Sequence, residues 1–503
     1  MRIAIVGGGA TGVLAAAHLA RRLDAANDEV VAIEPGEALG RGLAYATDDP
    51  RCLLNVRIAN MSAFADQPDH FYTWLRARRG ADVASPFSFI SRGLYGDYLA
   101  DLAEQTLSSG LVRRKRARCS DIEEWIDGVR LTLSTGETLT ADVAILATGH
   151  DAKPTFGGLL AEQPWSAGAL EGVSPDAAIL IVGSGLTMVD MALSLKRRGQ
   201  RGPIVVVSRR GLLSMAHRPA PPRDMNADDV PFGAELSHLL AWLRRLAARF
   251  AAEGADWRSA VDALRPHTQP LWAAMSLEQR RRFLRHARVY WDVHRHRMAP
   301  EIEAALRAIV DSGQLTLVAG RIVAARRSGE DVEVEILRRG AGATQTRRFA
   351  RIIDCTGLNE QPLKSANPLL RALLKRGVAR PDALGIGFDV ALDLGLVGAD
   401  GTVSPRIKAI GPLARAAFWE CIAIPDIRLQ CAALADALTK ARAPSAAARG
   451  LERPRAAERR PRSPAGRARW RRGSPKPKRA RFQPASHRRK APDALFPSGV
   501  GRA

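Results

Sequence analysis

The sequence opens with RIAIVGGGATG at residues 2–12, and this stretch decides the fold. The residues before the glycines have the nearly continuous apolar pattern of a buried strand, and a helical pattern follows from about Thr11 to Leu23. A second strand pattern covers Glu29 to Ile33. Strand, glycine-rich loop, helix and strand in this order predict a βαβ unit with the glycines at the helix N-terminus.

The glycines of this loop fit the G-x-G-x-x-G pattern of a dinucleotide-binding site. Gly7 permits the tight turn, Gly9 lets the backbone approach a pyrophosphate, and Gly12 lets helix and strand pack closely. We expect Ala10 and Thr11 to complete the pyrophosphate site, because the helix N-terminus directs its positive dipole end toward the phosphates.

An acidic residue, Glu34, follows the second strand. A carboxylate there accepts hydrogen bonds from an adenosine ribose and repels a 2′-phosphate, so the first site fits FAD or NAD and disfavours NADP. The segments Gly40–Tyr45 and Leu53–Val56 favour FAD, because a glycine-bearing loop and a small polar segment with Asn55 suit backbone contacts along an extended ribityl chain. Arg41 either reaches the pyrophosphate or is a solvated loop residue, and both interpretations stay open.

A second glycine loop lies further along the chain. The buried-strand pattern from Ala177 to Val182 leads into GSGLTM at residues 183–188 and then into a helix. We expect Gly183 and Gly185 to contact the phosphates of a second dinucleotide, with the hydroxyl of Thr187 beside them. A methionine replaces the third glycine, which loosens the packing of helix against strand.

The strand after this helix ends in SRRG at residues 208–211. Arg209 and Arg210, with Ser208, occupy the position of the acid in the first unit. Serine and arginine there bind a 2′-phosphate, and an arginine also stacks on adenine. This predicts NADPH as the second cofactor, with NADH as its alternative. The competing interpretation is an exposed arginine pair at a strand end.

Two stretches, Val112–Gly149 and Leu315–Gly357, each read as a β-meander followed by a strand that ends in Thr-Gly. We expect Thr148 and Gly149 to contact FAD. In the second stretch we expect separate strands at residues 315–318, 322–326 and 332–337.

The repetition of this pattern in two stretches predicts a FAD-binding domain that is interrupted by a nicotinamide-binding domain. The expected fold is α/β, with two Rossmann-like dinucleotide-binding domains, parallel sheets and β-meanders. Apolar residues at helical spacing between residues 234 and 311 predict a packed helical insert. The predicted divisions are residues 1–155 (FAD-binding, first part), 175–330 (NAD(P)-binding, with the insert), 331–440 (return to the FAD-binding domain) and 443–503 (a disordered basic tail).

Composition narrows the class of protein. Of the 503 residues, 46% are hydrophobic and 25% are charged, which is ordinary for a globular protein. No apolar run approaches the length of a membrane span, and the N-terminal strand does not read as a secretory signal, so we expect a cytoplasmic protein. The five cysteines lie far apart, which disfavours a disulfide reductase of the glutathione or thioredoxin reductase type.

The net charge of +23 is concentrated at one end of the chain. Residues 441–503 carry 19 Lys and Arg against three acids, so the tail holds +16 and the remainder +7. The tail has very few large apolar residues and cannot offset its ordering entropy by burial. The favoured interpretation of the tail is an unselected extension or a frame-shifted end of the reading frame. The functional alternative is a polybasic arm that binds nucleic acid or anionic lipid. We expect no specific nucleic-acid partner and no membrane partner.

With these motifs in view, the body of the chain, about Met1 to Lys440, resembles the FAD/NAD(P)-binding protein family, which is related to flavin-containing and N-hydroxylating monooxygenases. The resemblance implies that the segment around Gly411 and the helix opened by Ile424 and Pro425 close on the flavin ring. Further blocks that carry the resemblance are Arg41–Tyr45, Leu53–Asn55, Ser208–Gly211, Tyr290–Arg297 and Trp419–Arg428.

The block at residues 290–297 contains His294 and His296, which suggests a metal or an acid–base site. Residues two apart do not share a helix face, and only Asp292 offers a carboxylate. The favoured interpretation is a helix end packed by Trp291 with basic residues facing outward or toward phosphate. We predict no metal.

The motifs together predict an FAD-dependent, NAD(P)H-linked oxidoreductase that acts on a small-molecule substrate. NADPH would reduce FAD, and oxygen activation or transfer to another acceptor would follow. No catalytic side chain is assigned, because the flavin carries the chemistry. The alternative is a flavin-binding redox sensor or scaffold with little turnover. The substrate and the oligomeric state stay open.

Overall fold

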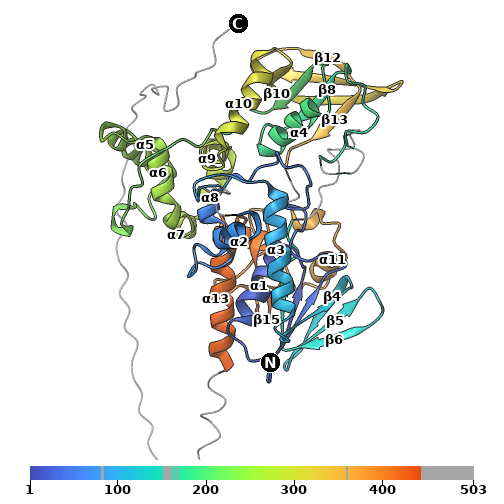
Figure 1. The fold of residues 1–503 in the computed structure, drawn as a ribbon, viewed down its shortest axis with the longest axis vertical. Coiled ribbons are helices and arrows are strands. Elements are labelled where there is room, and N and C mark those ends of the chain that lie inside the picture. The colour runs from blue at the N-terminus through green and yellow to red at the C-terminus, as the bar shows by residue number, and fades with distance from the viewer. Residues whose placement is uncertain (81–83, 151–160, 165, 167–168, 358–360, 443–503) are drawn as a thin grey trace, which may run out of the picture. The chain divides into compact units, whose positions relative to one another are not determined.

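The computed structural model describes residues 1–80, 84–150, 161–164, 166, 169–357 and 361–442. Met1–Ala441 form one compact unit (Figure 1). The tail predicted over residues 443–503 lies outside the described residues.

The first glycine loop belongs to a six-stranded sheet with the strand order β14-β15-β7-β1-β2-β3. Neighbouring strands are parallel except for the antiparallel pair β14 and β15. The carboxyl ends of the parallel strands therefore meet at one edge, where α/β proteins bind their ligands. The strands are β1 (Arg2–Val6), β2 (Glu29–Ile33), β3 (Val112–Lys115), β7 (Val143–Leu146), β14 (Gly395–Val397) and β15 (Val403–Ala409).

Helices cover one face of this sheet and a meander covers the other. Ile3 and Ile5 of β1 pack among residues of α1, α3 and α13, whereas Ala4 and Val6 pack among residues of the meander and α11. This division follows from the two-residue period of a strand. The elements are α1 (Ala10–Ala20), α2 (His70–Arg79), α3 (Arg92–Leu107), α11 (Pro368–Lys375), α12 (Arg415–Phe418) and α13 (Ile424–Arg442), with β4 (Cys119–Glu124), β5 (Val129–Leu133) and β6 (Thr138–Ala141) as the meander.

The second glycine loop belongs to another six-stranded sheet, in the order β12-β11-β10-β9-β8-β13. Ile179 and Ile181 of β8 pack among residues of α4 and α10, whereas Leu180 and Val182 pack among residues of β10 and β11. The elements are β8 (Ile179–Val182), β9 (Ile204–Ser208), β10 (Leu315–Ser328), β11 (Asp331–Arg338), β12 (Thr344–Phe349), β13 (Arg351–Asp354), α4 (Leu186–Arg197) and α10 (Pro300–Asp311).

The second meander differs from the prediction. The strands expected at residues 315–318 and 322–326 are one continuous strand, β10, with an irregularity between Ile322 and Ala324. This strand pairs in parallel with β9 and, further along, antiparallel with β11. Strand β12 was not predicted, because its sequence TQTRRF is exposed except for Phe349 and lacks an apolar alternation.

The return to the first sheet also comes later than residue 331. Strands β11, β12 and β13 all belong to the second sheet, and β13 pairs with β8. The first strand to rejoin the first sheet is β14. The meander that follows residue 331 is therefore part of the second sheet, and the predicted domain divisions stay predictions.

The helical insert was predicted over residues 234–311. Its helices between residues 236 and 295 lie to the left of both sheets in Figure 1, whereas α10 packs on the second sheet. Trp272 in α7 anchors the insert, because its indole Nε1 donates to the Ala416 carbonyl oxygen at 2.7 Å and its ring stacks on Trp419 at 4.7 Å. The helices are α5 (Leu236–Ala252), α6 (Trp257–Leu264), α7 (Thr268–Ala274), α8 (Leu277–Arg282), a π-helical turn (Phe283–Ala287) and α9 (Arg288–Arg295).

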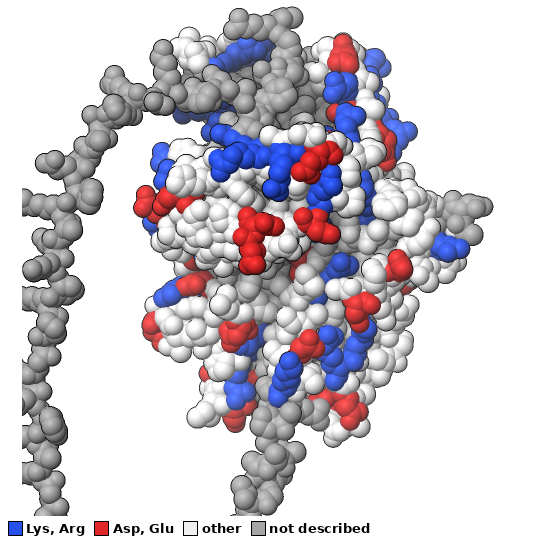
Figure 2. All heavy atoms as spheres, turned by 90° about the vertical axis from the view of Figure 1, so that its left-hand side faces the viewer, with Lys and Arg blue, Asp and Glu red and all other residues white. Residues whose placement is uncertain are grey.

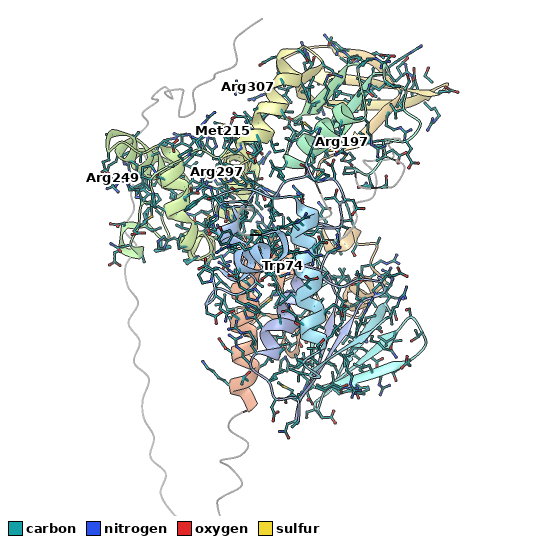
Figure 3. The ribbon with its side chains drawn as sticks, viewed as in Figure 1. Trp74, Arg197, Met215, Arg249, Arg297 and Arg307 are labelled. Carbon is teal, nitrogen blue, oxygen red and sulfur yellow. The ribbon has the colours of Figure 1, made fainter. Side chains whose placement is uncertain are left out.

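The surface on the insert side carries both signs of charge. Figure 2 shows a band of Lys and Arg side chains across this face with Asp and Glu beside it, and Arg249 marks the outer edge of the insert in Figure 3. Within the described residues, no helix combines the length and the apolarity that crossing a bilayer requires.

Candidate functional site

The first glycine loop has three glycines with different roles. A Cβ on Gly7, whose φ is +108°, would lie 2.4 Å from the Ala147 carbonyl oxygen, and one on Gly12 would lie 1.9 Å from the Gly7 carbonyl oxygen. These two glycines are required by the protein's own packing. A Cβ on Gly9 would meet only Gly42, at an ordinary 3.6 Å. Gly9 thus leaves open the space that a phosphate would occupy.

Helix α1 begins directly after this loop, with Ala10 and Thr11 in its first turn. Its N-cap is Gly9, which offers no side-chain acceptor, and its first turn holds no acidic residue. The amides of this turn therefore suit an anion such as a pyrophosphate.

Glu34 holds the loop closed. Its carboxylate oxygens accept hydrogen bonds from the backbone amides of Gly8 at 2.8 Å and Gly36 at 2.9 Å. Because a carboxylate has about four lone-pair sites, capacity remains for ribose hydroxyls. The sequence did not single out Gly8, where a Cβ would lie 2.4 Å from Leu39.

Two further predicted residues, Arg41 and Asn55, are held by partners. Arg41 forms an ion pair with Asp97 in α3, so the guanidinium is fixed rather than freely solvated. The carbonyl oxygen of Asn55 is 3.0 Å from His217 Nε2. Burial, with the Arg297 charge nearby, lowers the pKa of His217 to about 4, so the ring is neutral and donates Nε2–H. His217 was missed because it is distant in the sequence.

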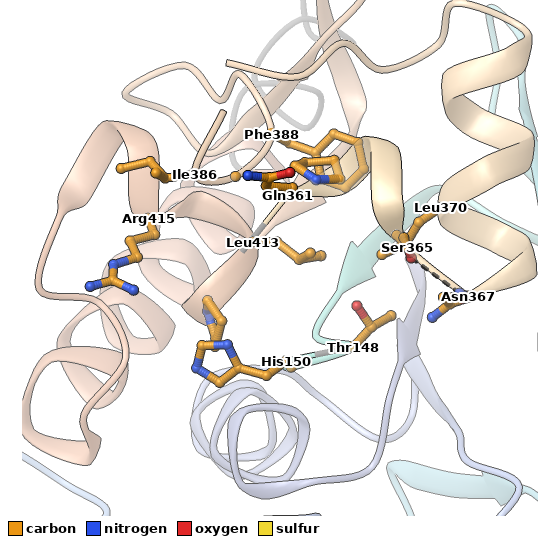
Figure 4. A pocket seen from close by; sticks show the side chains of 14 residues that line it. Thr148, His150, Gln361, Ser365, Asn367, Leu370, Ile386, Phe388, Leu413 and Arg415 are labelled. Carbon is orange, nitrogen blue, oxygen red and sulfur yellow. Dashed lines mark hydrogen bonds between the residues drawn. The ribbon is translucent and has the colours of Figure 1, made fainter. Parts of the chain in front are cut away.

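The residues that follow β7 and β15 form part of the wall of an open pocket (Figure 4). Thr148 and Gly149 follow β7, and Gly149 has a φ of +69°. The Thr148 hydroxyl is buried and makes no hydrogen bond among the described residues. Polar and apolar side chains are interspersed around the pocket (Figure 4). They are His150, Gln361, Ser365, Asn367 and Arg415, and Leu370, Ile386, Phe388 and Leu413.

Gly411 connects this pocket with the first glycine loop. Its φ is +66°, and a Cβ there would lie 3.0 Å from the Thr11 side chain. Its amide donates to Gln430 Oε1 at 3.0 Å, and its carbonyl oxygen accepts from the Cys421 thiol at 3.1 Å. The structure therefore brings Gly411 and Thr11 together. The open space at Gly9 and the buried Thr148 hydroxyl fit a FAD that extends from the loop toward the pocket.

The second glycine loop repeats this geometry. Gly183 has a φ of +101°, and a Cβ there would lie 2.4 Å from the Cys355 carbonyl oxygen, whereas Gly185 has open space. Thr187 lies in the first turn of α4. Met188, in place of the third glycine, is fully buried and fills the gap between helix and sheet.

The end of β9 lies beside this loop, because the Ser184 and Ser208 hydroxyl oxygens are 2.9 Å apart. Arg209 is exposed. Arg210 donates from Nη1 to the Tyr290 hydroxyl at 3.0 Å, and its guanidinium lies 5.1 Å from the centre of the Tyr290 ring. Two arginines thus stand where the first unit has Glu34. The sequence did not predict the contact with Tyr290.

Charged contacts join the two dinucleotide-binding parts. Arg92 Nη2 in α3 lies 3.1 Å from Asp190 Oδ2 in α4. Burial nevertheless raises the pKa of Asp190 to about 6, because desolvation outweighs the attraction to Arg92. Arg197, labelled on α4 in Figure 3, forms an ion pair with Asp49 of the first part. No local sequence pattern signals these pairs.

The C-terminal segment meets the insert through Glu420. This buried carboxylate accepts from Trp291 Nε1 at 2.9 Å and from Arg295 Nε at 3.1 Å. The adjacent His294 Nδ1 lies 2.8 Å from the Tyr290 carbonyl oxygen, and burial lowers the pKa of His296 to about 4. Within the part of the chain that the structure describes, no three His, Cys, Asp or Glu side chains gather as metal ligands would.

A model of the FAD-NAD(P)-binding family matches residues 4–151. The described residues have the two-domain fold of FAD/NAD(P)-binding flavoproteins, as the sequence predicted. No curated protein matches the chain.

Solved structures of N-hydroxylating enzymes share this fold. L-lysine 6-monooxygenase from Pseudomonas syringae is 16% identical, with a TM-score of 0.61 over 88% of this chain and 99% of its own. Ornithine N-hydroxylase from Kutzneria, solved with reduced FAD, NADP⁺ and L-ornithine, is 14% identical, with a TM-score of 0.60 over 88% and 99%. Ornithine hydroxylase from Pseudomonas aeruginosa is 15% identical, with a TM-score of 0.58 over 87% and 98%. At these identities the likeness is one of fold.

Proposed function

We propose that the chain is an FAD-dependent oxidoreductase that takes reducing equivalents from NADPH and acts on a small molecule with oxygen, or passes electrons to another acceptor. The observation that carries the proposal is the pair of glycine loops with opposite charges beside them. Glu34 stands at the first loop, and Arg209 and Arg210 stand at the second. A carboxylate disfavours a 2′-phosphate and arginines favour it, so the loops suit different dinucleotides.

The chain's own residues would bind and orient the two cofactors. Gly7–Gly12 and α1 would hold the FAD pyrophosphate, and Thr148, Gly149 and Gly411 would line the path toward the pocket. Gly183, Gly185 and Thr187 would hold the phosphates of NADPH. Bound FAD would supply hydride acceptance and the reaction with oxygen. The pocket wall of Phe388, Leu413 and Arg415 would exclude water and receive the substrate.

Stopped-flow reduction of the purified, FAD-loaded chain tests this proposal. NADPH should bleach the flavin absorbance faster than NADH does. Peroxide yield in air should then fall when the right substrate is present, and a panel of amines and other small nucleophiles is the first to try, because the structural neighbours include ornithine and lysine hydroxylases. Absence of bleaching with either nucleotide would favour a flavin-binding sensor or scaffold. Equal rates would refute the preference for NADPH.

A further inference from the structure

The insert reaches the end of β9 through Tyr290. The hydroxyl of this residue accepts from Arg210 Nη1 at 3.0 Å, and the ring lies 5.1 Å from the guanidinium carbon. The turn that carries Arg210 is itself set against the second glycine loop. The Ser208 hydroxyl lies 2.9 Å from the Ser184 hydroxyl and accepts from the Gly211 amide at 3.1 Å. The backbone of Arg210 is thus held by its turn, and its guanidinium is held by Tyr290.

The tyrosine stands on a fixed helix. Next to it, Trp291 donates to the buried Glu420, and one turn further Arg295 donates to the same carboxylate. Adjacent residues of a helix point in different directions, so α9 presents Tyr290 to β9 while Trp291 faces the C-terminal segment. Tyr290 therefore has a defined place although the residue is 37% exposed.

An arginine binds phosphate best when its planar fork is already oriented, because a free side chain loses rotamer freedom on binding. Arg209, its neighbour, is exposed and has no ion-pair partner among the described residues. Arg210 is therefore the better candidate for a preorganised phosphate ligand, and the feature that orients it lies in the insert rather than in the nucleotide-binding part.

We propose that Tyr290 is a positioning residue for Arg210 and that the helical insert thereby sets the preference for an adenosine ligand with a 2′-phosphate. The inference rests on the proposed use of NADPH and deepens it. Tyr290 acts on the 2′-phosphate end of the ligand, away from the loop that holds the pyrophosphate.

Calorimetric binding of adenosine 2′,5′-bisphosphate and of ADP to the FAD-loaded full chain tests this inference without turnover. Tyr290→Phe keeps the ring and removes the acceptor oxygen, and it should weaken the bisphosphate by about 3- to 10-fold, the range of one hydrogen bond. Tyr290→Leu should weaken it further, toward the affinity of Arg210→Met. Affinity for ADP should change by less than about twofold in all three. Tyr72→Phe is the matched control, because Arg76 also lies over that ring, at 5.9 Å.

The outcomes separate the two claims. If the unaltered chain binds both ligands equally, the NADPH assignment falls and the inference falls with it. If the unaltered chain prefers the bisphosphate and Tyr290→Phe keeps that preference in full, only the inference is overturned. Equal weakening of both ligands in Tyr290→Phe would also overturn it, because that result marks a general structural role.

Discussion

Replacing Gly9 and Gly12 by alanine should separate the demands of FAD from those of the fold. At Gly12 a new Cβ would lie 1.9 Å from the Gly7 carbonyl oxygen, and only a backbone shift relieves that contact. Overpacking of this kind costs about 1–3 kcal/mol, and a backbone clash belongs at the upper end or above. The apoprotein of Gly12→Ala should therefore melt several degrees below the unaltered apoprotein.

At Gly9 the opposite result is expected. The residue has φ −72° and ψ −169°, which alanine adopts without strain, and its nearest neighbour would lie at an ordinary 3.6 Å. The apoprotein should be unchanged, or more stable by about 0.4–1 kcal/mol from the lower entropy of the unfolded chain. The methyl group would fill the space expected for the pyrophosphate. If its cost resembles overpacking, about 1–3 kcal/mol, FAD should bind about 5- to 150-fold more weakly.

Thermal unfolding of the deflavinated protein, followed by circular dichroism, measures the first effect, and titration of FAD fluorescence measures the second. Gly185→Ala is the matched control. Its Cβ also meets open space, but it lies in the second loop, so it should weaken NADPH and leave FAD binding unchanged. Normal FAD affinity in Gly9→Ala would show that the pyrophosphate does not pass this residue.

Three further predictions concern charge. Arg209→Ala should reduce the NADPH-to-NADH ratio of flavin reduction rates by roughly tenfold, because it removes about one hydrogen bond to a charged group. An unchanged ratio would leave Arg210 as the only arginine of the pair that binds the phosphate. Burial raises the pKa of Asp190 from 3.8 to about 6 in the folded state. The folded state therefore binds a proton that the unfolded state has released, so the free energy of unfolding should fall by about 2 kcal/mol as the pH rises from about 4 to about 6, relative to Asp190→Asn. The pKa of His217 is lowered from 6.5 to about 4, so stability should be lost as pH falls through this window, and chemical denaturation of His217→Gln should show a weaker loss.

Much of the first part of the chain was predictable from local pattern. The strand at residues 2–6, the glycine loop and Glu34 lie within one βαβ unit, where each neighbour in sequence is also a neighbour in space. The second loop was predictable for the same reason. Strand β12 was not, because a polar edge strand such as TQTRRF gains its order from pairing with β11 rather than from burial of its own side chains.

The contacts that join distant segments had no signal in the sequence. His217 meets Asn55, and Arg92 meets Asp190, although neither pair shares an element or a period. A single amino-acid sequence shows which residues are charged. It does not show which partner the fold will place beside each of them. These pairs arise where α4 and the strand ends pack against the first part, a geometry that depends on the whole fold.

The contact between Tyr290 and Arg210 is a long-range contact of this kind, and it bears on the proposed function. A strand-ending arginine pair has two interpretations in the sequence, a phosphate site or a solvated strand end, because nothing local orients the side chains. A partner from the insert favours the first, since a solvated arginine needs no tyrosine to hold it. The same helix also holds Glu420, which is followed by Cys421 on the Gly411 carbonyl oxygen. Helix α9 thus contacts Arg210 beside the second glycine loop, and it contacts Glu420, whose neighbour Cys421 meets Gly411 near the first loop. On the proposal made above, the insert would contribute to the cofactor sites and would not be a separate addition to the fold.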